Sequence, residues 1–204
     1  MSSGQFIVLE GIDGAGTTTQ AALLAEWLRS LGHDAVPTLE PTEGPFGSII
    51  RRILEGSFGD AVNEQTMAFL FGADRSDHLD RTILPALEAG SVVVSDRYYL
   101  SSVAYQSLDV DMEWVEALNA RFPRPGLTVF LDVPAGVCLE RKRAMGTPAE
   151  RYEHLHFLER IRANYLEAIA HARAAGERIE TLDGSEPTET VAERIRALVA
   201  PLLA

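Results

Sequence analysis

The stretch from residue 6 to residue 18 reads Phe-Ile-Val-Leu-Glu-Gly-Ile-Asp-Gly-Ala-Gly-Thr-Thr, and it decides the fold. Its first four residues are apolar without interruption, which is typical of a strand buried on both faces of a sheet. Glycines follow, and then the segment from Gln20 to Leu31 repeats leucine and tryptophan at helical spacing until Gly32. The stretch therefore predicts a buried strand, a glycine-rich turn and a helix in direct succession.

Apolar segments of strand length alternate with segments of helical period along the rest of the chain. This alternation is typical of a parallel sheet with helices on both faces, so the sequence predicts an α/β fold. We find no repeat, low-complexity segment or linker, and interpret residues 1–204 as a single domain. Five strands are expected at 6–9, 35–39, 91–95, 127–133 and 179–182, and helices at 20–31, 46–54, 63–89, 111–122, 135–144, 149–174 and 188–203.

The composition excludes several classes of protein. No apolar run approaches the ~20 residues of a membrane span, and a net charge of −12 argues against generic binding to nucleic acid or anionic membranes. Any bound phosphate must therefore lie in a locally built pocket. Cys138 is the only cysteine, and the first residues lack the pattern of a secretory signal, so we expect a cytoplasmic protein. Lys142 is the only lysine among 18 basic residues.

The glycine-rich turn has the context and spacing of a phosphate-binding loop. Gly11 and Gly16 fit the pattern G-x-x-x-x-G-K-[ST], in which backbone N–H groups and a helix N-terminus hold an anion. Thr18 occupies the position of the hydroxyl that binds magnesium, but Thr17 stands where the lysine belongs. Either another cation, such as an arginine, replaces this lysine or turnover is weakened. The alternative is a tight turn without a ligand.

A second segment, residues 92–98, places Asp96 at the tip of an apolar strand. In a phosphate-loop protein, a carboxylate at this point holds Mg²⁺ beside the hydroxyl of Thr18. Arg97 follows and is expected in the same crevice, at the carboxyl ends of the strands. The alternative is an Asp-Arg pair that ends a strand and caps a helix.

Four segments of the chain resemble the thymidylate kinase family. Residues 94–106 read Val-Ser-Asp-Arg-Tyr-Tyr-Leu-Ser-Ser-Val-Ala-Tyr-Gln and look like its signature. Residues 9–14 are similar to its opening, 69–75 to its nucleoside-binding helix and 140–153 to its mobile lid, here expected around 141–153. The resemblance implies the phosphate-loop nucleoside monophosphate kinase fold, Mg²⁺-dependent transfer of the γ-phosphoryl of ATP to dTMP, and a homodimer.

The resemblance also implies roles for individual residues. The ATP phosphates would lie against Gly11, Ile12, Asp13, Gly14, Ala15, Gly16, Thr17 and Thr18, and Mg²⁺ against Thr18 and Asp96. The dTMP contacts would be Asp13 to the 3′-hydroxyl, Phe71 and Arg75 to the base, Ser102 to the base, Tyr105 near the 2′ carbon and Arg97 to the monophosphate. Arg141, Arg143 and Arg151 would close over ATP from the lid.

Alternatives stay open for several of these residues. Phe71 also suits plain core packing, and Arg75 a surface ion pair of little energetic weight. The five histidines show no metal-ligand spacing and are interpreted as surface residues, whereas Cys138 is interpreted as core. Two other functions stay open, the first because the shape of the pocket selects the base, and the second because Thr17 replaces the lysine and Leu39 stands where the family commonly has arginine. The first is another deoxynucleoside or nucleoside monophosphate kinase, and the second is a nucleotide-binding protein with weakened turnover. Met145 likewise takes a lid position that is often arginine.

Overall fold

The structure, a computed structural model, describes residues 4–58, 62–144 and 151–203, with the side chains of residues 151–154 left undescribed. Within these residues five strands form one sheet, and all the strand pairs are parallel. The sheet order is β2-β3-β1-β4-β5, which confirms the predicted α/β class and the five strands. The strands are β1 Gln5–Glu10, β2 Ala35–Leu39, β3 Val92–Asp96, β4 Leu127–Asp132 and β5 Ile179–Asp183.

The three central strands carry the core of the protein. Ile7 in β1, Val93 in β3 and Val129 in β4 are fully buried, as expected for strands covered on both faces. The two edge strands β2 and β5 alternate between buried and more exposed residues instead. Uninterrupted apolar sequence therefore marked the centre of the sheet, and mixed sequence marked its edges.

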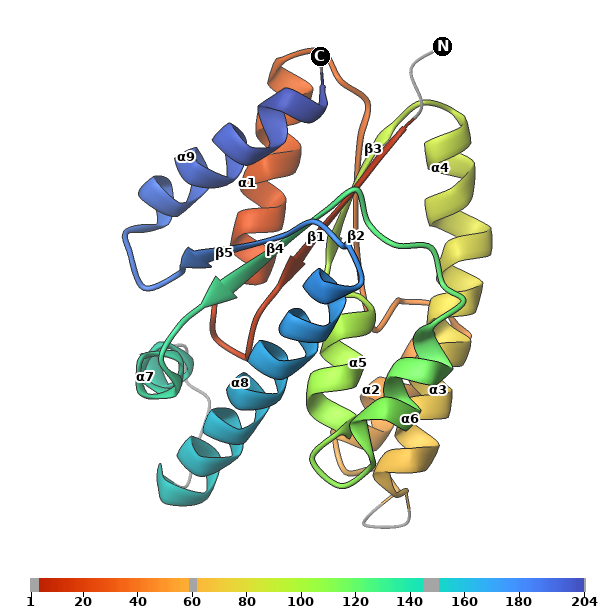
Figure 1. The fold of residues 1–204 in the computed structure, drawn as a ribbon, viewed down its shortest axis with the longest axis vertical. Helices are drawn as coiled ribbons and strands as arrows, with labels where there is room; N and C mark the ends of the chain where they lie inside the picture. The colour runs from red at the N-terminus through yellow and green to blue at the C-terminus, as the bar shows by residue number, and fades with distance from the viewer. Residues whose placement is uncertain (1–3, 59–61, 145–150, 204) are drawn as a thin grey trace.

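Helices cover both faces of this sheet (Figure 1). Helices α1 and α9 lie against each other on one face, and α5 and α8 pack together on the other. The helices are α1 Thr17–Ser30, α2 Pro45–Leu54, α3 Glu64–His78, α4 Leu84–Glu88, α5 Tyr99–Gln106, α6 Met112–Asn119, α7 Ala135–Ala144, α8 Arg151–Ala174 and α9 Thr188–Val199. A short 3₁₀ turn, Ala200–Leu202, follows α9.

Two helical predictions need correction. The single helix expected over 63–89 is interrupted by a π-helical turn at Leu79–Ile83, where the N–H of Leu84 bonds to the carbonyl of Leu79. Pro85 explains this turn, because its ring displaces the carbonyl four residues earlier and the ladder widens to accommodate it. Helix α5 was not predicted at all. Most of its residues are buried, the polar Ser102 and Gln106 among them, so its polar residues do not mark an exposed face.

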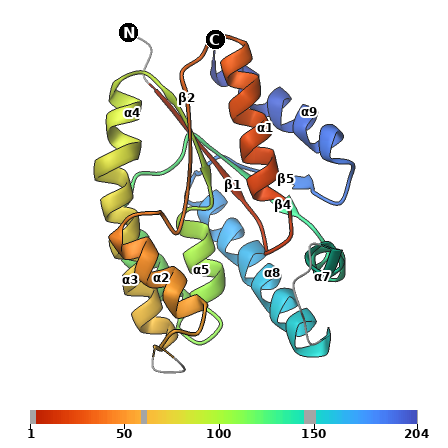
Figure 2. The ribbon, with the colours of Figure 1, turned by 180° about the vertical axis from the view of Figure 1, so that it is seen from behind.

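The carboxyl ends of the strands form one end of the molecule. Helix α7 and the first turns of α8 lie on one side of this end, and α2 and α3 lie on the other (Figures 1 and 2). This arrangement leaves the glycine-rich loop after β1 between two groups of helices. Among the described helices, none combines the length and the hydrophobicity needed to cross a membrane.

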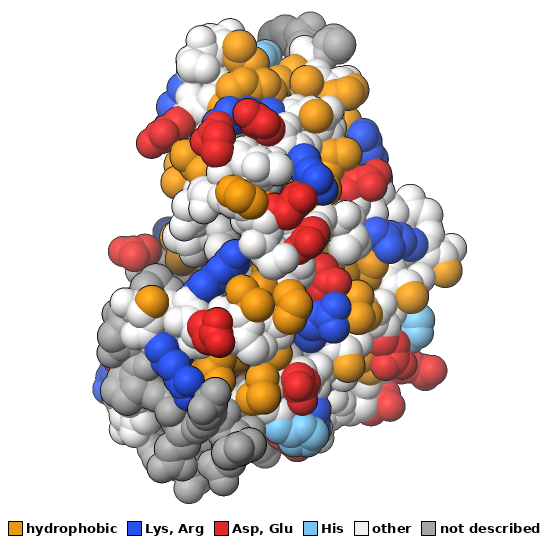
Figure 3. Space-filling view, turned by 90° about the vertical axis from the view of Figure 1, so that its left-hand side faces the viewer, with side chains coloured by type: hydrophobic (Ala, Val, Ile, Leu, Met, Phe, Trp, Pro, Cys, Tyr) orange, Lys and Arg blue, Asp and Glu red, His pale blue; other side chains and the backbone are white. Residues whose placement is uncertain are grey.

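The face that carries α9 shows how the negative charge is distributed. Acidic, basic and hydrophobic side chains are interspersed on it rather than gathered by kind (Figure 3). Ion pairs Arg194–Glu186 and Arg196–Glu189, both at 2.9 Å, lie on or beside α9. The surface at this face therefore offers no broad basic area for a phosphate, which agrees with a local pocket as the binding site.

Candidate active site

The loop after β1 is shaped by two glycines in the left-handed region. Gly14 has φ 90° and Gly16 has φ 97°, conformations that side chains with a Cβ rarely adopt. A Cβ on Gly14 would also lie 2.7 Å from the carbonyl oxygen of Cys138, so the loop packs directly on α7. Cys138 is fully buried, as predicted. The sequence of the loop is thus dictated by its curled backbone and by its contact with α7.

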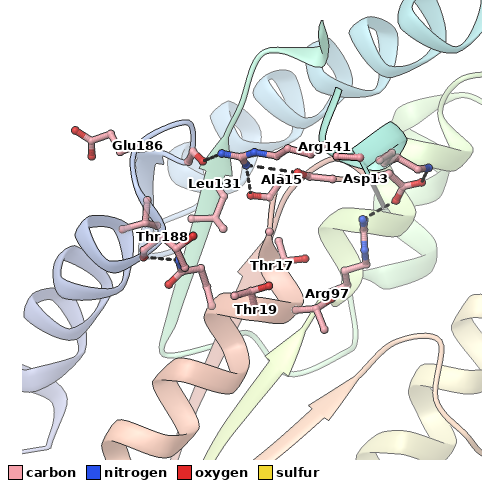
Figure 4. A pocket seen from close by; sticks show the side chains of 17 residues that line it. Asp13, Ala15, Thr17, Thr19, Arg97, Leu131, Arg141, Glu186 and Thr188 are labelled. Carbon is pink, nitrogen blue, oxygen red and sulfur yellow. Dashed lines mark hydrogen bonds and ion pairs between the residues drawn. The ribbon is translucent and has the colours of Figure 1, made fainter. Parts of the chain in front are cut away.

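A cavity of about 680 Å³ opens over this loop and the first turn of α1, lined by residues 13–20 (Figure 4). The first turn of α1 holds no acidic side chain, and the positive end of the helix dipole faces the cavity, whose lining also includes Asp13 and Glu186. Gln20, at the end of this turn, donates to the carbonyl of Thr188 at 2.9 Å and ties α1 to α9. The cavity therefore has the character of an anion site.

Thr18 and Asp96 meet at the edge of this cavity. The parallel pairing of β1 with β3 places Leu9 opposite Asp96, and the Thr18 hydroxyl donates to Asp96 Oδ2 at 2.5 Å. The other carboxylate oxygen, Oδ1, is buried and has no hydrogen-bond partner among the described residues. A hydroxyl beside a carboxylate with a free oxygen suits Mg²⁺, which takes one or two protein ligands and completes its shell with phosphate and water.

No larger metal cluster competes with this pair. Across residues 4–58, 62–144 and 151–203, excluding the side chains of 151–154, no group of three or more histidine, cysteine, aspartate or glutamate side chains could hold an ion. A cation at Thr18 and Asp96 would therefore depend on oxygens of a bound phosphate for its remaining ligands.

Arg97 is held in an unusual conformation by several contacts. Its φ of 73° is the only positive value at a non-glycine residue that the structure describes. Its guanidinium donates to Asp13 Oδ1 at 2.8 Å, to Ser101 at 3.2 Å and to the Tyr165 hydroxyl at 3.3 Å. The guanidinium also lies over the Tyr105 ring, 5.3 Å from its centre. A strained conformation held by so many contacts makes Arg97 a candidate functional residue.

Asp13 gathers contacts from both sides of the loop. Besides Arg97, its carboxylate accepts from the hydroxyl of Tyr105 at 2.9 Å and faces the Lys142 ammonium at 3.5 Å. Burial raises the pKa of this carboxyl, but the charges of Arg97 and Lys142 outweigh it, and the net pKa lies below its ordinary value. Asp13 is therefore ionised at neutral pH and links two cations.

Glu10 lies beneath this cluster, and the sequence reasoning missed it. Its carboxylate is fully buried and accepts from the Ser101 hydroxyl at 2.6 Å, the Tyr165 hydroxyl at 2.9 Å and the Tyr98 N–H at 2.9 Å. Burial raises its pKa to about 7, although these hydrogen bonds and the charge of Arg97 oppose the rise. The available signal was an acidic residue directly after four apolar strand residues.

A second cavity, of about 250 Å³, lies between α3 and α5. Phe71, Arg75, Ser102 and Tyr105 line it, so the structure brings together the residues expected to surround a base and a sugar. Phe71 is half-buried at this wall. The lining combines an aromatic face with convergent polar groups, which is the usual make-up of a small-molecule site.

Arg75 is fully buried, so the alternative of a surface ion pair is wrong. Its guanidinium donates to Glu40 at 2.7 Å, to Ser102 at 3.0 Å and to Asn119 at 2.5 Å. Its Nε–H is buried without a partner among the described residues. Arg75 is thus a structural centre as well as a wall of the second cavity.

His78 is also buried, which corrects its interpretation as a surface residue. Its Nδ1 lies 3.1 Å from Glu40 Oε1, and its Nε2 lies 2.6 Å from the Thr38 hydroxyl. The physical reason is helical spacing, since Arg75 and His78 are three residues apart and share the face of α3 that meets Glu40. No isolated property of the histidine indicated this, because its partner lies 38 residues away in sequence.

The predicted lid is described only in part. Arg141 donates to the backbone carbonyls of Ala15 at 3.2 Å and Gly184 at 3.0 Å, so it lies across the loop (Figure 4). Arg143, near the end of α7, is half-buried and lines neither cavity. Residue 145 and the side chain of Arg151 lie outside the described residues.

The two cavities meet at one point. Asp13 and Arg97 line both of them, so whatever occupies the loop cavity faces what occupies the second cavity across this pair. A phosphate donor in one cavity and an acceptor in the other would approach each other there. This is the arrangement that phosphoryl transfer between two bound molecules requires.

Comparison with known proteins identifies relatives of the chain. A family model described as "Thymidylate kinase" matches residues 9–195. The chain is 42% identical to "Probable thymidylate kinase" of Thermococcus kodakarensis over 97% of this chain and 98% of the relative. It is 46% identical to "Probable thymidylate kinase" of Pyrococcus horikoshii over 80% and 82%, and 38% identical to "Thymidylate kinase" of Ruegeria pomeroyi over 97% and 95%.

Proposed function

This chain belongs to the thymidylate kinase family, and from this premise we propose that it transfers the γ-phosphoryl group of ATP to dTMP, giving ADP and dTDP. The observation that carries the proposal is the meeting of two cavities at Asp13 and Arg97. One cavity has the character of an anion site over a helix N-terminus, and the other has an aromatic and polar lining that suits a nucleoside.

We assign the donor to the loop cavity. The backbone N–H groups of residues 14–18 and the N-terminus of α1 would hold the ATP phosphates. Arg141 supports this assignment indirectly. Its guanidinium donates to the carbonyl oxygens of Ala15 and Gly184, so these two acceptors point at Arg141 and away from a bound anion. Together with Arg143 and Arg151, it belongs to the segment around 141–153 that we propose closes over ATP and excludes water.

We assign the acceptor to the second cavity. Phe71 would stack on the thymine ring, while Arg75 and Ser102 would contact its polar edge. Tyr105 and Asp13, which bond to each other at 2.9 Å, would border the deoxyribose, with Asp13 at the 3′-hydroxyl. A hydroxyl added at the 2′ carbon would crowd Tyr105, so this pair favours deoxyribonucleotides.

Mg²⁺ would be held by Thr18 and Asp96. When bound there, it would neutralise charge on the donor phosphates. The free buried oxygen of Asp96 supports this assignment, because a buried carboxylate oxygen without a donor is costly unless a cation or water occupies it.

Catalysis then rests on alignment and on charge. The protein performs little covalent chemistry in phosphoryl transfer and mainly positions the donor and the acceptor. Arg97 would direct its guanidinium at the dTMP phosphate from the junction of the two cavities, where its strained backbone holds it ready. We further propose that residues 1–204 act as a single domain in a cytoplasmic homodimer, whose mass sedimentation would measure.

The test is an ADP-forming assay with dTMP, dUMP, dCMP and no acceptor in parallel. The proposal expects ADP formation that depends on dTMP and Mg²⁺. Equal or faster turnover with another nucleotide would favour a different nucleoside monophosphate kinase. Nucleotide binding without ADP formation would favour a protein that has lost turnover. Both are disfavoured by the family and by the names of the relatives.

A further inference from the structure

We propose that Lys142 supplies the positive charge that the phosphate loop lacks at Thr17, by placing its ammonium group against the outer phosphates of ATP. This inference rests on the proposed function and adds a residue to it. Thr17 is 5% exposed and lines the loop cavity, so the position that normally carries the ammonium faces the phosphates without a charge.

The described walls of the cavity carry three cationic side chains, namely Arg97, Arg141 and Lys142. Arg141 is occupied, because its guanidinium bonds to the carbonyls of Ala15 and Gly184. Arg97 is held at 2.8 Å by Asp13 and also lines the acceptor cavity. Lys142 therefore stands out as the cation that can be redirected at the least cost.

The contact that holds Lys142 is weak and easily exchanged. Its ammonium lies 3.5 Å from Asp13 Oδ2, whereas Arg97 and the Tyr105 hydroxyl contact the other oxygen of Asp13 at 2.8 and 2.9 Å. When Lys142 moves to a phosphate, Asp13 keeps these two partners. Asp13 thus holds the ammonium at the mouth of the loop until a more highly charged anion arrives.

The chemistry of the side chain suits this role. Lysine presents a compact charge with three donors on a flexible four-carbon stem, which can follow a phosphate without a fixed bidentate geometry. The Lys142 side chain is 29% exposed and lies near the end of α7, so its stem has room to reorient. It is also the only lysine in a chain whose other 17 basic residues are arginine.

The first test replaces Lys142 with methionine, which keeps the stem and removes the charge. Because a hydrogen bond to a charged group is lost, we expect ATP to bind about 10- to 100-fold more weakly, with a fall in kcat. Calorimetry without dTMP should show unchanged affinity for AMP, which has no outer phosphate. Arg81→Met, at an exposed cation outside both cavities, is the matched control and should leave ATP binding unchanged.

The second test asks whether the two positions are interchangeable. Thr17→Lys in the wild-type background should change ATP affinity little, whereas in the Lys142→Met background it should restore most of the loss. Lys142→Arg should retain part of the affinity. If Lys142 served only as a structural salt-bridge partner of Asp13, Thr17→Lys would not restore the ATP affinity lost in Lys142→Met.

Three results would overturn the inference. The first is ATP binding by Lys142→Met that is as tight as that of the wild type. The second is a loss of dTMP affinity, instead of ATP affinity, in this variant. The third is an equal gain in ATP affinity from Thr17→Lys in both backgrounds. Failure of the proposed function is distinguishable, because it appears as wild-type protein that forms no ADP with dTMP. The comparison of ATP with AMP binding tests Lys142 in that case as well.

Discussion

Replacing Arg75 with methionine should destabilise the fold severely, because it leaves Glu40 buried without its cationic partner. The Arg75 side chain is 0% exposed and the Glu40 side chain 2% exposed, and their atoms are 2.7 Å apart. Removing one partner of such a buried pair costs about 3–5 kcal/mol, because the remaining carboxylate loses the guanidinium and keeps only the His78 ring, at 3.1 Å. The change also leaves the side chains of Ser102 and Asn119 without the guanidinium.

A second substitution separates the buried charge from the lost packing. Glu40→Gln in the Arg75→Met background removes the uncompensated carboxylate, so it should recover about 2 kcal/mol or more of the loss. Arg75→Met also removes the contact of the guanidinium with the Tyr98 ring, at 5.1 Å, and this part is not recovered. The two variants together therefore measure how much of the cost is electrostatic.

The assay is equilibrium unfolding in urea at pH 7, followed by circular dichroism. With an m-value of roughly 2–3 kcal/mol/M, a loss of about 3–5 kcal/mol lowers the midpoint by about 1–2.5 M. Arg81→Met, whose side chain is 72% exposed, serves as the control and should hardly move the midpoint. A midpoint for Arg75→Met that matches this control, or a double variant less stable than the single one, would refute the reasoning.

Three further predictions concern protonation, the metal and the cysteine. The pKa of Glu10 is raised from 4.5 to about 7 in the folded protein, so its contribution to the free energy of unfolding is fully present below pH 4.5 and is lost as the pH rises through about 7, by up to about 3 kcal/mol. Glu10→Gln should flatten this decline of the unfolding free energy, measured by urea titrations between pH 5 and 8, and equal slopes in the variant and the wild type would contradict the prediction. Asp96→Asn should raise the Mg²⁺ concentration for half-maximal activity by about tenfold or more, whereas Asp132→Asn, at the end of β4 and bonded to Arg162, should not. Cys138 is fully buried with its pKa raised to about 11, so a thiol reagent at pH 8 should modify it only after urea unfolds the protein, and rapid labelling of the native protein would count against this.

The fold was predictable because its strands are apolar and its turns are rich in glycine. Unbroken apolar sequence indicates that the central strands are buried, and the spacing of Gly11 and Gly16 indicates the phosphate-binding loop. The pairing of Thr18 with Asp96 was expected as well, since the carboxyl ends of parallel strands meet at one edge. Helix α5 was not predicted because its polar residues Ser102 and Gln106 are buried together with its apolar ones, so polarity does not distinguish a buried face from an exposed one.

The missing parts of the site share a different cause. Arg75 meets Glu40 across 35 residues, Glu10 meets Tyr165 across 155 and Lys142 meets Asp13 across 129. Propensity and period act locally, so they cannot indicate which distant charges will be buried together. The packing of α3, α7 and α8 around the sheet, which carries Arg75, Lys142 and Tyr165 to their partners, determines these pairs.

The left-handed backbone of Arg97 has a consequence for any survey of substitutions at this position. Every uncharged residue except glycine keeps the unfavourable φ of this position but loses the ion pair with Asp13 that holds it, so the backbone around it is free to relax. A loss of activity in Arg97→Ala or Arg97→Met therefore combines two causes, the missing side chain and a rearranged main chain. Glycine, which tolerates the torsion, isolates the first of them.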